Sequence, residues 1–379
     1  MQVNFLVVFL YSQHHTMMDE DISFSDLPTI YVKESDPYDF GLLLGRHFAP
    51  MIQSRATKDP ILHTELLPFS KSEEGHKLIQ MLSKTNSQRF PHHWDEMRGI
   101  ADGSGVPFSE VLLLNFRKEV SPFLASNPAR IGSQDAENCS DFLIASNNLT
   151  IIAHNEDADV SVQDHIFMVH ASLPDHTSFV ACTYAGELPT CAFGFNNYGV
   201  AFTLNAVPLA PEEVVAGGVG RNFISRDLLE ATSLDDALKR VRVNELSAGH
   251  SYNIMDLSTH KVLNVESASM GRFSICEATG VPFFHANMYL HLHVKQVPNE
   301  SSIYRQKRAV ELPKSSKSQI LAALGDTSNT EYPIYMEGPR LCTLCTVYFD
   351  LHKQMMTIYK GNPGLQQIGL EFSMDMNAV

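Results

Sequence analysis

The chain has 379 residues, of which 44% are hydrophobic and 19% are Asp, Glu, Lys or Arg, and its formal net charge is −15. This composition is typical of a globular enzyme with a sizeable core, and the length does not exclude one large domain. Nucleic-acid binding needs a basic surface, so the acidic charge excludes it as an expected function. Six cysteines over this length do not make a disulfide framework, which favours a reducing compartment and a cytoplasmic location.

A short apolar stretch, Phe5 to Leu10, lies near the start of the chain. It lacks the basic flank and the small-residue cleavage site of a signal peptide, and it is too short to span a bilayer. We therefore expect no membrane association. Met17 and Met18 are followed by an acidic run, which favours a start there, so residues 1–16 are expected to be a dispensable extension.

The segment before Cys139 predicts mainly helices. Asp36 and Pro37 form an N-cap with proline at the first helical position. Further helices are expected from Trp94 to Ala101 and from Pro107 to Glu119. The apolar face of the first helix recurs at steps of four residues, at Phe40, Leu44, Phe48 and Ile52.

Short apolar runs replace the helical spacing after Cys139 and predict strands. Residues 142–145 and 149–153 predict a hairpin whose first strand begins at the cysteine. Helices are expected only at 222–231 and 234–241. Helices followed by many strands, without a linker or an internal repeat, predict one α+β layered domain. Other strands are expected at Ser178–Cys182, Gly199–Asn205, Tyr252–Asp256, Val262–Val265, Leu344–Phe349 and Met355–Tyr359.

Cys139 follows a polar, breaker-rich stretch and stands where a core strand begins. A thiol there can attack the carbonyl of Asn138, and hydrolysis of the thioester would leave Cys139 with a free α-amino group. That amine, with an ordinary pKa of about 7.7–8.0, can act as base for its own thiol. The attack needs a strained turn, whose backbone angles Asn tolerates, although less well than Gly. The local sequence alone leaves an inert core cysteine as the alternative.

Several motifs follow one another along the chain. They are Cys139-Ser140-Asp141, His154-Asn155-Glu156-Asp157, Gly194 to Asn205, His285-Ala286-Asn287, and Ser301-Ser302 with Arg305. Their order and spacing resemble the acyl-coenzyme A:isopenicillin N acyltransferase family of N-terminal-nucleophile (Ntn) hydrolases. The resemblance extends from about Pro28 to Pro363, and the clear departure is Asn138, where family members usually carry Gly.

The resemblance implies an α+β fold, the four-layer αββα sandwich of Ntn hydrolases. It implies that Cys139 is the nucleophile, that Asp157 holds the α-ammonium group, and that Asn287 stabilises the oxyanion. Further candidates for substrate binding are Asn155, Asn205 and Arg305. The arginine could clamp a carboxylate, or it could be a solvated helical residue.

The resemblance also implies an activity. Self-cleavage would give an α chain (residues 1–138) and a β chain (residues 139–379), which together form one catalytic domain. The expected reaction is hydrolysis of a β-alanyl, or similar acyl, amide of a biogenic amine through a thioester on Cys139, with a small cationic substrate and no cofactor. Two alternatives stay open: an acyltransferase that uses a coenzyme A thioester, and an uncleaved relative without enzymatic activity.

We expect no metal site. The pair Cys342 and Cys345 begins an apolar strand-like run and is expected in the core. The histidine pairs 92/93 and 291/293, expected at a helix start and on a strand, have no second ligand at a suitable spacing.

Overall fold

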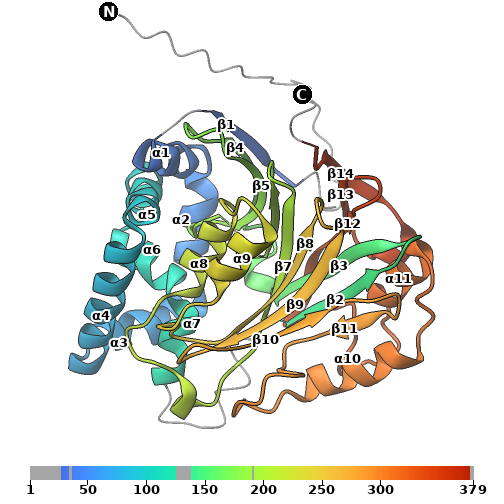
Figure 1. Ribbon diagram of the computed structural model, residues 1–379. Coiled ribbons are helices and arrows are strands. Elements are labelled where there is room, and N and C mark those ends of the chain that lie inside the picture. Colours follow the sequence, from blue (N-terminus) through green and yellow to red (C-terminus); the bar gives the residue numbers. More distant parts are fainter. Residues whose placement is uncertain (1–26, 34–35, 125–137, 190–191, 376–379) are drawn as a thin grey trace, which may run out of the picture.

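The computed structural model describes residues 27–33, 36–124, 138–189 and 192–375. Two β-sheets lie face to face, and helices cover the outer face of each sheet (Figure 1). The α+β class and the four layers expected from the sequence are therefore confirmed. The proposed extension, residues 1–16, lies outside the described residues.

The larger sheet has eight strands in the order β1-β4-β5-β6-β7-β8-β9-β10, and the smaller has six in the order β11-β2-β3-β12-β13-β14. Only β1 and β4 pair in parallel among the described ladders. The strands are β1 (Thr29–Lys33), β2 (Asn138–Ala145), β3 (Thr150–Asp159), β4 (Ile166–Ser172), β5 (Ser178–Tyr184), β6 (Phe193–Asn196), β7 (Val200–Ala206), β8 (His250–Asp256), β9 (Lys261–Ala268), β10 (Arg272–Glu277), β11 (Phe283–His285), β12 (Leu341–Asp350), β13 (Met355–Tyr359) and β14 (Ile368–Ser373).

The helices divide between the two outer faces. Those before β2, together with α8 and α9, pack on the larger sheet, while α10 and α11 pack on the smaller one (Figure 1). The α-helices are α1 (Pro37–His47), α2 (Ala49–Lys58), α3 (Leu67–Ser70), α4 (Glu73–Arg89), α5 (Pro91–Ser104), α6 (Phe108–Asn115), α7 (Arg117–Val120), α8 (Arg221–Leu228), α9 (Leu234–Val241), α10 (Glu300–Glu311) and α11 (Lys317–Leu324).

Most predicted elements are found, with differences at their ends. Asp36 caps α1 by accepting a hydrogen bond from the Asp39 N–H at 3.0 Å, as its N-cap pattern predicts. The helix breaks at Phe48, so its apolar face continues on α2. The expected helix from Pro107 is likewise two helices, α6 and α7, and neither β1 nor α4 was expected. The strand expected at His291 is wrong, because the chain there pairs with no strand.

Three apolar layers separate the four layers of secondary structure. One lies between the helices and the larger sheet, a second between the two sheets, and a third between the smaller sheet and α10 and α11. Both faces of β2 and β3 are therefore buried. This explains why most of their side chains are apolar and why their polar side chains are hydrogen-bonded inside the protein. In the described part of the chain, no helix has both the length and the apolar character needed to cross a membrane.

Helices α1 and α5 touch through glycines. A Cβ atom at Gly41 would lie 1.9 Å from the carbonyl oxygen of Glu96, and one at Gly99 would lie 2.1 Å from that of Tyr38. Both obstacles are backbone atoms, so they cannot move aside without shifting a helix. The close approach of α1 and α5 thus depends on glycine at these two positions, because glycine has no side chain.

We expect Gly41→Ala to destabilise the protein by about 1–3 kcal/mol, because the clash outweighs the better helix propensity of alanine. The control is Gly280→Ala, where the nearest heavy atom to a new Cβ is Ser146 Cβ at 3.5 Å. Urea unfolding measures both variants. Equal stability of the Gly41→Ala variant and the wild type would contradict the close contact.

Candidate active site

The register of the β2–β3 hairpin brings four polar side chains together between the sheets. Cys139 pairs with Glu156, and Asp141 pairs with His154. Directly paired residues share a face of the sheet, and so do residues two apart on one strand. Leu143, on the same face of β2 as Cys139, packs in the layer between the sheets. The thiol of Cys139 therefore faces this layer as well.

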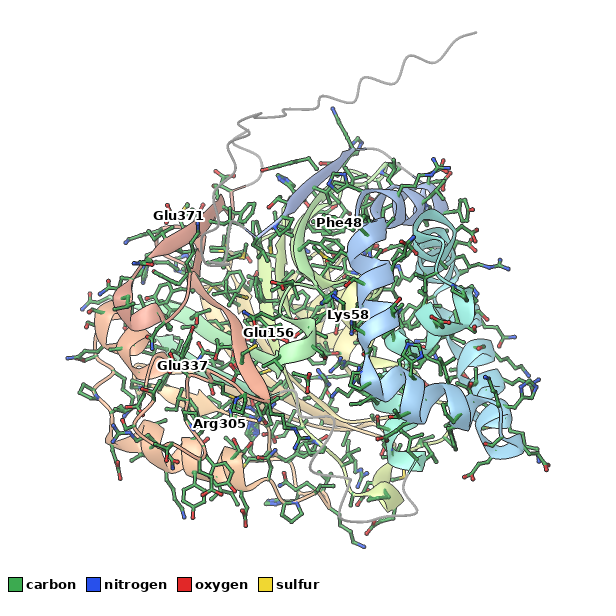
Figure 2. All side chains as sticks on the ribbon, turned by 180° about the vertical axis from the view of Figure 1, so that it is seen from behind. Phe48, Lys58, Glu156, Arg305, Glu337 and Glu371 are labelled. Carbon is green, nitrogen blue, oxygen red and sulfur yellow. The ribbon has the colours of Figure 1, made fainter. Side chains whose placement is uncertain are left out.

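A continuous chain of hydrogen bonds runs behind the thiol. Cys139 Sγ donates to Glu156 Oε2 at 3.7 Å, and His154 Nε2 lies 2.9 Å from the same oxygen. The other nitrogen of His154, Nδ1, lies 2.9 Å from Asp141 Oδ2. From the larger sheet, the Tyr184 hydroxyl donates to Glu156 Oε1 at 2.5 Å. Glu156 lies in the interior of the molecule, between the layers (Figure 2).

His154 is held as an imidazolium. Burial by itself lowers the pKa of His154, but the Asp141 and Glu156 carboxylates on its two nitrogens raise that pKa to about 10. Asp141 also accepts hydrogen bonds from Thr203 Oγ1 and Asn205 Nδ2 of β7, both at 2.6 Å. This buried network therefore ties the smaller sheet to the larger one directly beside Cys139.

The backbone of Cys139 is held by two other side chains. Asn287 follows β11 by two residues, and its Oδ1 accepts the Cys139 N–H at 2.8 Å. Arg305 of α10 donates from Nη1 to the Cys139 carbonyl oxygen at 2.6 Å and from Nη2 to Asn287 Oδ1 at 2.9 Å. Since a guanidinium only donates, it fixes the amide of Asn287 with its oxygen toward Cys139.

The structure decides against one of the two alternatives that the sequence left open for Arg305. Its side chain is 0% exposed, so it is not a solvated helical residue. Among the described residues its hydrogen-bond partners are neutral oxygens, and they include the hydroxyls of Ser140 at 2.9 Å and Ser302 at 3.2 Å. Contact with a substrate carboxylate stays a prediction. Burial lowers the pKa of Arg305, and the nearby Asp157 carboxylate opposes that shift.

Asp157 lies on the opposite face from the thiol, in register with Asn138. Its Oδ1 accepts a hydrogen bond from Thr343 Oγ1 at 2.5 Å, while its buried Oδ2 has no hydrogen-bond partner among the described residues. Burial raises the pKa of Asp157 to about 7, although the Thr343 hydroxyl and the Arg305 charge oppose this shift. Asp157 pairs with Asn138, the residue directly before Cys139. Its carboxylate oxygen without a partner is suited to accept a hydrogen bond from an ammonium group on Cys139.

Asn155 and Asn205 are both bonded to the fold itself. Asn155 Nδ2 donates to the carbonyl oxygens of Leu324 at 2.8 Å and Ile334 at 3.1 Å, which fastens the end of α11 to β3. Asn205 joins the network at Asp141 and accepts a hydrogen bond from Asn253 at 3.1 Å. Contact of either residue with a substrate stays a prediction.

The strained turn expected at Asn138 is wrong. The strand β2 already begins at this residue, which pairs with Asp157 in the ladder, and it is not among the described non-glycine residues with positive φ. Pairing with Asp157 in the ladder keeps the backbone of Asn138 extended, and the N–H of the following peptide is bound by Asn287.

Four residues of the site were missed from the sequence: His154, Glu156, Asp141 and Tyr184. The signal that could have found the first two is their alternation, since polar residues two apart in an apolar strand share one face. Tyr184 had no such signal, because its contact with Glu156 depends on how the two sheets stack.

In the part of the chain that the structure describes, two groups of side chains could hold a metal ion. The ligand atoms of Cys139, His154 and Glu156 all lie within 4.8 Å of one another, as do those of His93, Asp227 and Glu230. The spacing along the sequence could not show the second group, because it forms only where α8 brings Asp227 to 3.8 Å from His93 Nε2.

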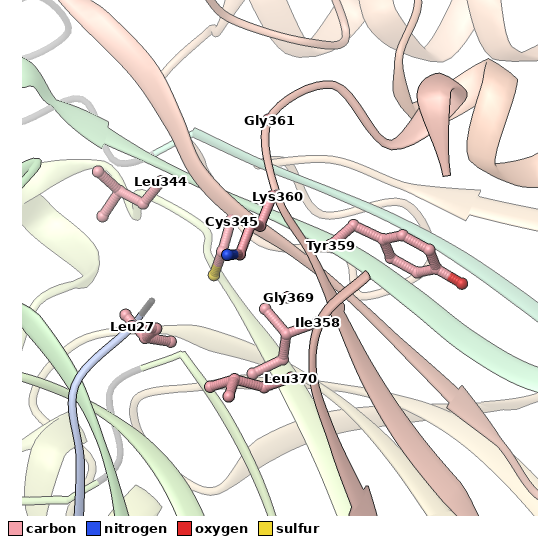
Figure 3. Close-up of a pocket in the computed structure, with 9 residues that line it drawn as sticks. All are labelled: Leu27, Leu344, Cys345, Ile358, Tyr359, Lys360, Gly361, Gly369 and Leu370. Atoms are coloured by element: carbon pink, nitrogen blue, oxygen red, sulfur yellow. The ribbon is translucent and has the colours of Figure 1, made fainter. Parts of the chain in front are cut away.

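A small pocket lies beside β12, β13 and β14 (Figure 3). Its lining includes Leu27, Leu344 and Cys345, and none of the predicted site residues lines it. Cys345 is 7% exposed, as expected for a core cysteine, whereas Cys342 is half-buried.

Comparison with known proteins decides the family. A model of the acyl-coenzyme A:6-aminopenicillanic acid acyl-transferase family matches residues 144–365. The chain belongs to this family. The expected membership is thus confirmed, and so is the expected enzyme class, an amidohydrolase or acyltransferase acting on amide bonds.

The chain is also similar to individual proteins. The chain is 26% identical over 366 residues to the β-alanyl-dopamine/carcinine hydrolase of Drosophila melanogaster, covering 89% of this chain and 93% of the relative. It is 24% identical over 302 residues to the 40 kDa form of acyl-coenzyme A:6-aminopenicillanic-acid-acyltransferase of Emericella nidulans, covering 76% and 81%. A solved mutant of the conjugated bile acid hydrolase from Clostridium perfringens is 13% identical with a TM-score of 0.32, covering 64% of this chain and 93% of that one.

The raised pKa of Asp157 predicts a pH dependence of stability. Between its ordinary value of about 3.9 and its folded value of about 7, the carboxyl binds a proton in the folded chain but not in the unfolded one. Its contribution to stability therefore falls as the pH rises through this range. Relative to a Cys139→Ala parent, Asp157→Asn should be about equally stable near pH 4 and more stable by about 2–4 kcal/mol near pH 8, at about 1.4 kcal/mol per pKa unit.

Urea unfolding of the two chains at both pH values measures the difference. The Cys139→Ala parent lacks the thiol that the expected self-cleavage needs, so both samples have the same covalent structure whether or not the wild type is cut. A stability difference that does not change with pH would contradict the raised pKa.

Proposed function

We propose that this chain cuts itself between Asn138 and Cys139 and then works as an Ntn amidohydrolase with Cys139 as nucleophile. The observation that carries the proposal is how the fold holds this one residue. Asn287 binds its N–H, Arg305 binds its carbonyl oxygen, and Glu156 faces its thiol. A residue that reacts through both its thiol and its α-amine needs both groups positioned.

Self-cleavage would proceed by transfer of an acyl group from nitrogen to sulfur. The Cys139 sulfur attacks the carbonyl carbon of Asn138, a C–S bond forms, the C–N bond breaks, and the nitrogen of Cys139 takes up a proton. Water then hydrolyses the thioester, which leaves a carboxylate on Asn138 and a free amine on Cys139. The products would be the α chain (residues 1–138) and the β chain (residues 139–379) of one catalytic domain.

The acceptors around the Cys139 nitrogen suit the mature state. Once Asn138 is detached, the amine can deprotonate its own thiol, and Asn287 Oδ1 is already 2.8 Å from this nitrogen. The unpartnered Oδ2 of Asp157 supplies negative charge for the protonated form. In turnover, the thiol attacks the substrate amide, the amine product leaves, and water releases the acid. Asn287 Nδ2 donates one hydrogen to the Ala206 carbonyl oxygen at 3.0 Å, so its second amide hydrogen would stabilise the oxyanion.

The proposed substrate is a β-alanyl conjugate of a biogenic amine. The relative that covers 89% of this chain is named for hydrolysis of β-alanyl-dopamine and carcinine, although it is only 26% identical. The net charge of −15 favours a small cationic substrate over an anionic one. The second candidate is acyl transfer from a coenzyme A thioester to an amine, which the acyltransferase relative supports.

Intact mass tests the self-cleavage. We expect two fragments that meet at Asn138 and Cys139 in the wild type, and a single chain in the Cys139→Ala variant, because the alanine has no nucleophile. One uncut chain in both samples would contradict self-processing and favour the uncleaved, non-enzymatic alternative.

The same samples test the substrate. Wild type should release β-alanine from β-alanyl-dopamine and from carcinine, and the Cys139→Ala variant should not. N-acetyl-dopamine serves as a control for the acyl group. Adding a free amine separates the two reactions, since an acyltransferase forms the new amide whereas a hydrolase forms the acid.

Asn138→Gly should speed self-cleavage, because glycine weakens the strand pairing at this residue and reaches the backbone angles of a strained turn. The cut fraction is followed by mass after synthesis is arrested. Asn138→Asp, which keeps a side chain of similar size and shape, is the control. An unchanged or lower rate in the glycine variant would show that the ladder at Asn138 does not limit cleavage.

A further inference from the structure

The side chains behind the thiol have the composition of a zinc site. We propose that Cys139 Sγ, His154 Nε2 and Glu156 Oε2 together bind one zinc ion, which would hold the thiol in an unreactive state. The binding site depends only on the positions of these atoms in the structure. The inhibitory effect rests in addition on the proposed role of Cys139 as nucleophile.

The spacing of the three atoms fits tetrahedral zinc. Zinc bonds of about 2.3 Å to sulfur and about 2.0–2.2 Å to nitrogen or oxygen put neighbouring ligand atoms about 3.3–3.6 Å apart. Cys139 Sγ and Glu156 Oε2 are 3.7 Å apart, His154 Nε2 and Glu156 Oε2 are 2.9 Å apart, and all three lie within 4.8 Å of one another. Small side-chain movements therefore suffice to coordinate the ion.

Each of the three ligands is oriented by a further contact. Asp141 Oδ2 lies 2.9 Å from Nδ1 of His154, so the carboxylate directs the other nitrogen toward the site. The Tyr184 hydroxyl binds Oε1 of Glu156 at 2.5 Å and so turns Oε2 toward the thiol. The backbone of Cys139 is held by Asn287. Such outer contacts are what distinguish a preformed metal site from a chance grouping of side chains.

Zinc binding would leave the buried charge unchanged. The ion displaces the thiol proton of Cys139 and the proton with which His154 Nε2 now binds Glu156. One ion of charge +2 thus replaces two protons, and no additional net charge is buried. This matters because an uncompensated charge in the interior is costly. The thiolate and imidazole also favour zinc over magnesium or calcium, which prefer oxygen ligands.

The second histidine group serves as a comparison. His93, Asp227 and Glu230 offer no thiolate, and arginines already occupy both carboxylates. Arg226 Nη1 lies 2.8 Å from Glu230 Oε1, and Arg240 Nη1 lies 2.6 Å from Asp227 Oδ1. We therefore place the zinc site at Cys139 and use His93→Asn as the matched control.

Cobalt(II) provides the test, because a bound thiolate gives a sulfur-to-cobalt charge-transfer band and four-coordination gives intense visible bands. The purified full-length chain should show both with one equivalent of cobalt, and zinc should remove them. His93→Asn should keep both bands. Cys139→Ala should lose the charge-transfer band, and Glu156→Gln should weaken binding. Tyr184→Phe, which alters only an outer contact, should weaken binding about 10–100-fold.

No charge-transfer band in the wild type, or the same band in Cys139→Ala, would overturn the site. The Tyr184→Phe variant keeps the test valid if a ligand variant misfolds. An unchanged cobalt affinity in Tyr184→Phe would also count against the proposed zinc site. Self-cleavage is read separately by mass after folding with zinc or with a chelator, and zinc should leave more uncut chain. A chain that stays uncut even with the chelator sinks the proposed self-processing but not the zinc site, whose band needs no cleavage.

Discussion

The register of β2 against β3 is the constraint on which the site depends. It places Cys139 opposite Glu156 and Asp141 opposite His154, all in the layer between the sheets. A slip of β2 by one residue along β3 would turn Cys139 and Asp141 toward α10 and α11. Such a slip would also separate the imidazolium of His154 from the Asp141 carboxylate. Losing one partner of a buried ion pair costs about 3–5 kcal/mol, so the charges themselves fix the register.

The side chain and the backbone of Cys139 have different neighbours, because a strand directs its side chains and its peptide groups in different directions. The inter-sheet face surrounds the thiol with charged groups from β3 and from the larger sheet. The edge toward β11 and α10 supplies Asn287 and Arg305, which bind the N–H and the carbonyl oxygen of Cys139. Chemistry at sulfur and chemistry at nitrogen are therefore controlled by separate sets of residues, and each set can be altered without removing the other.

The sequence predicted what depends on local pattern. The hairpin after Cys139 and the capped start of α1 at Asp36 follow from short-range periodicity and turn residues, and both are found. The strand expected at His291 is wrong because alternation alone does not supply a pairing partner. The burial of Arg305 and the contact of Tyr184 with Glu156 depend on how distant elements dock, which neither composition nor spacing encodes. The motif order gave the family but could not give the inward-facing network.

Zinc binding and self-cleavage would compete for the same sulfur electrons. In the uncut chain the Cys139 nitrogen belongs to an amide and cannot act as a base, so the acceptor that the thiol faces is Glu156. The same oxygen is a ligand in the proposed zinc site. A zinc ion there would bind both the nucleophile, Cys139 Sγ, and the proton acceptor, Glu156 Oε2. Hydrolysis of the chain is irreversible whereas metal binding is reversible, so zinc would set when the cut happens and not whether it happens.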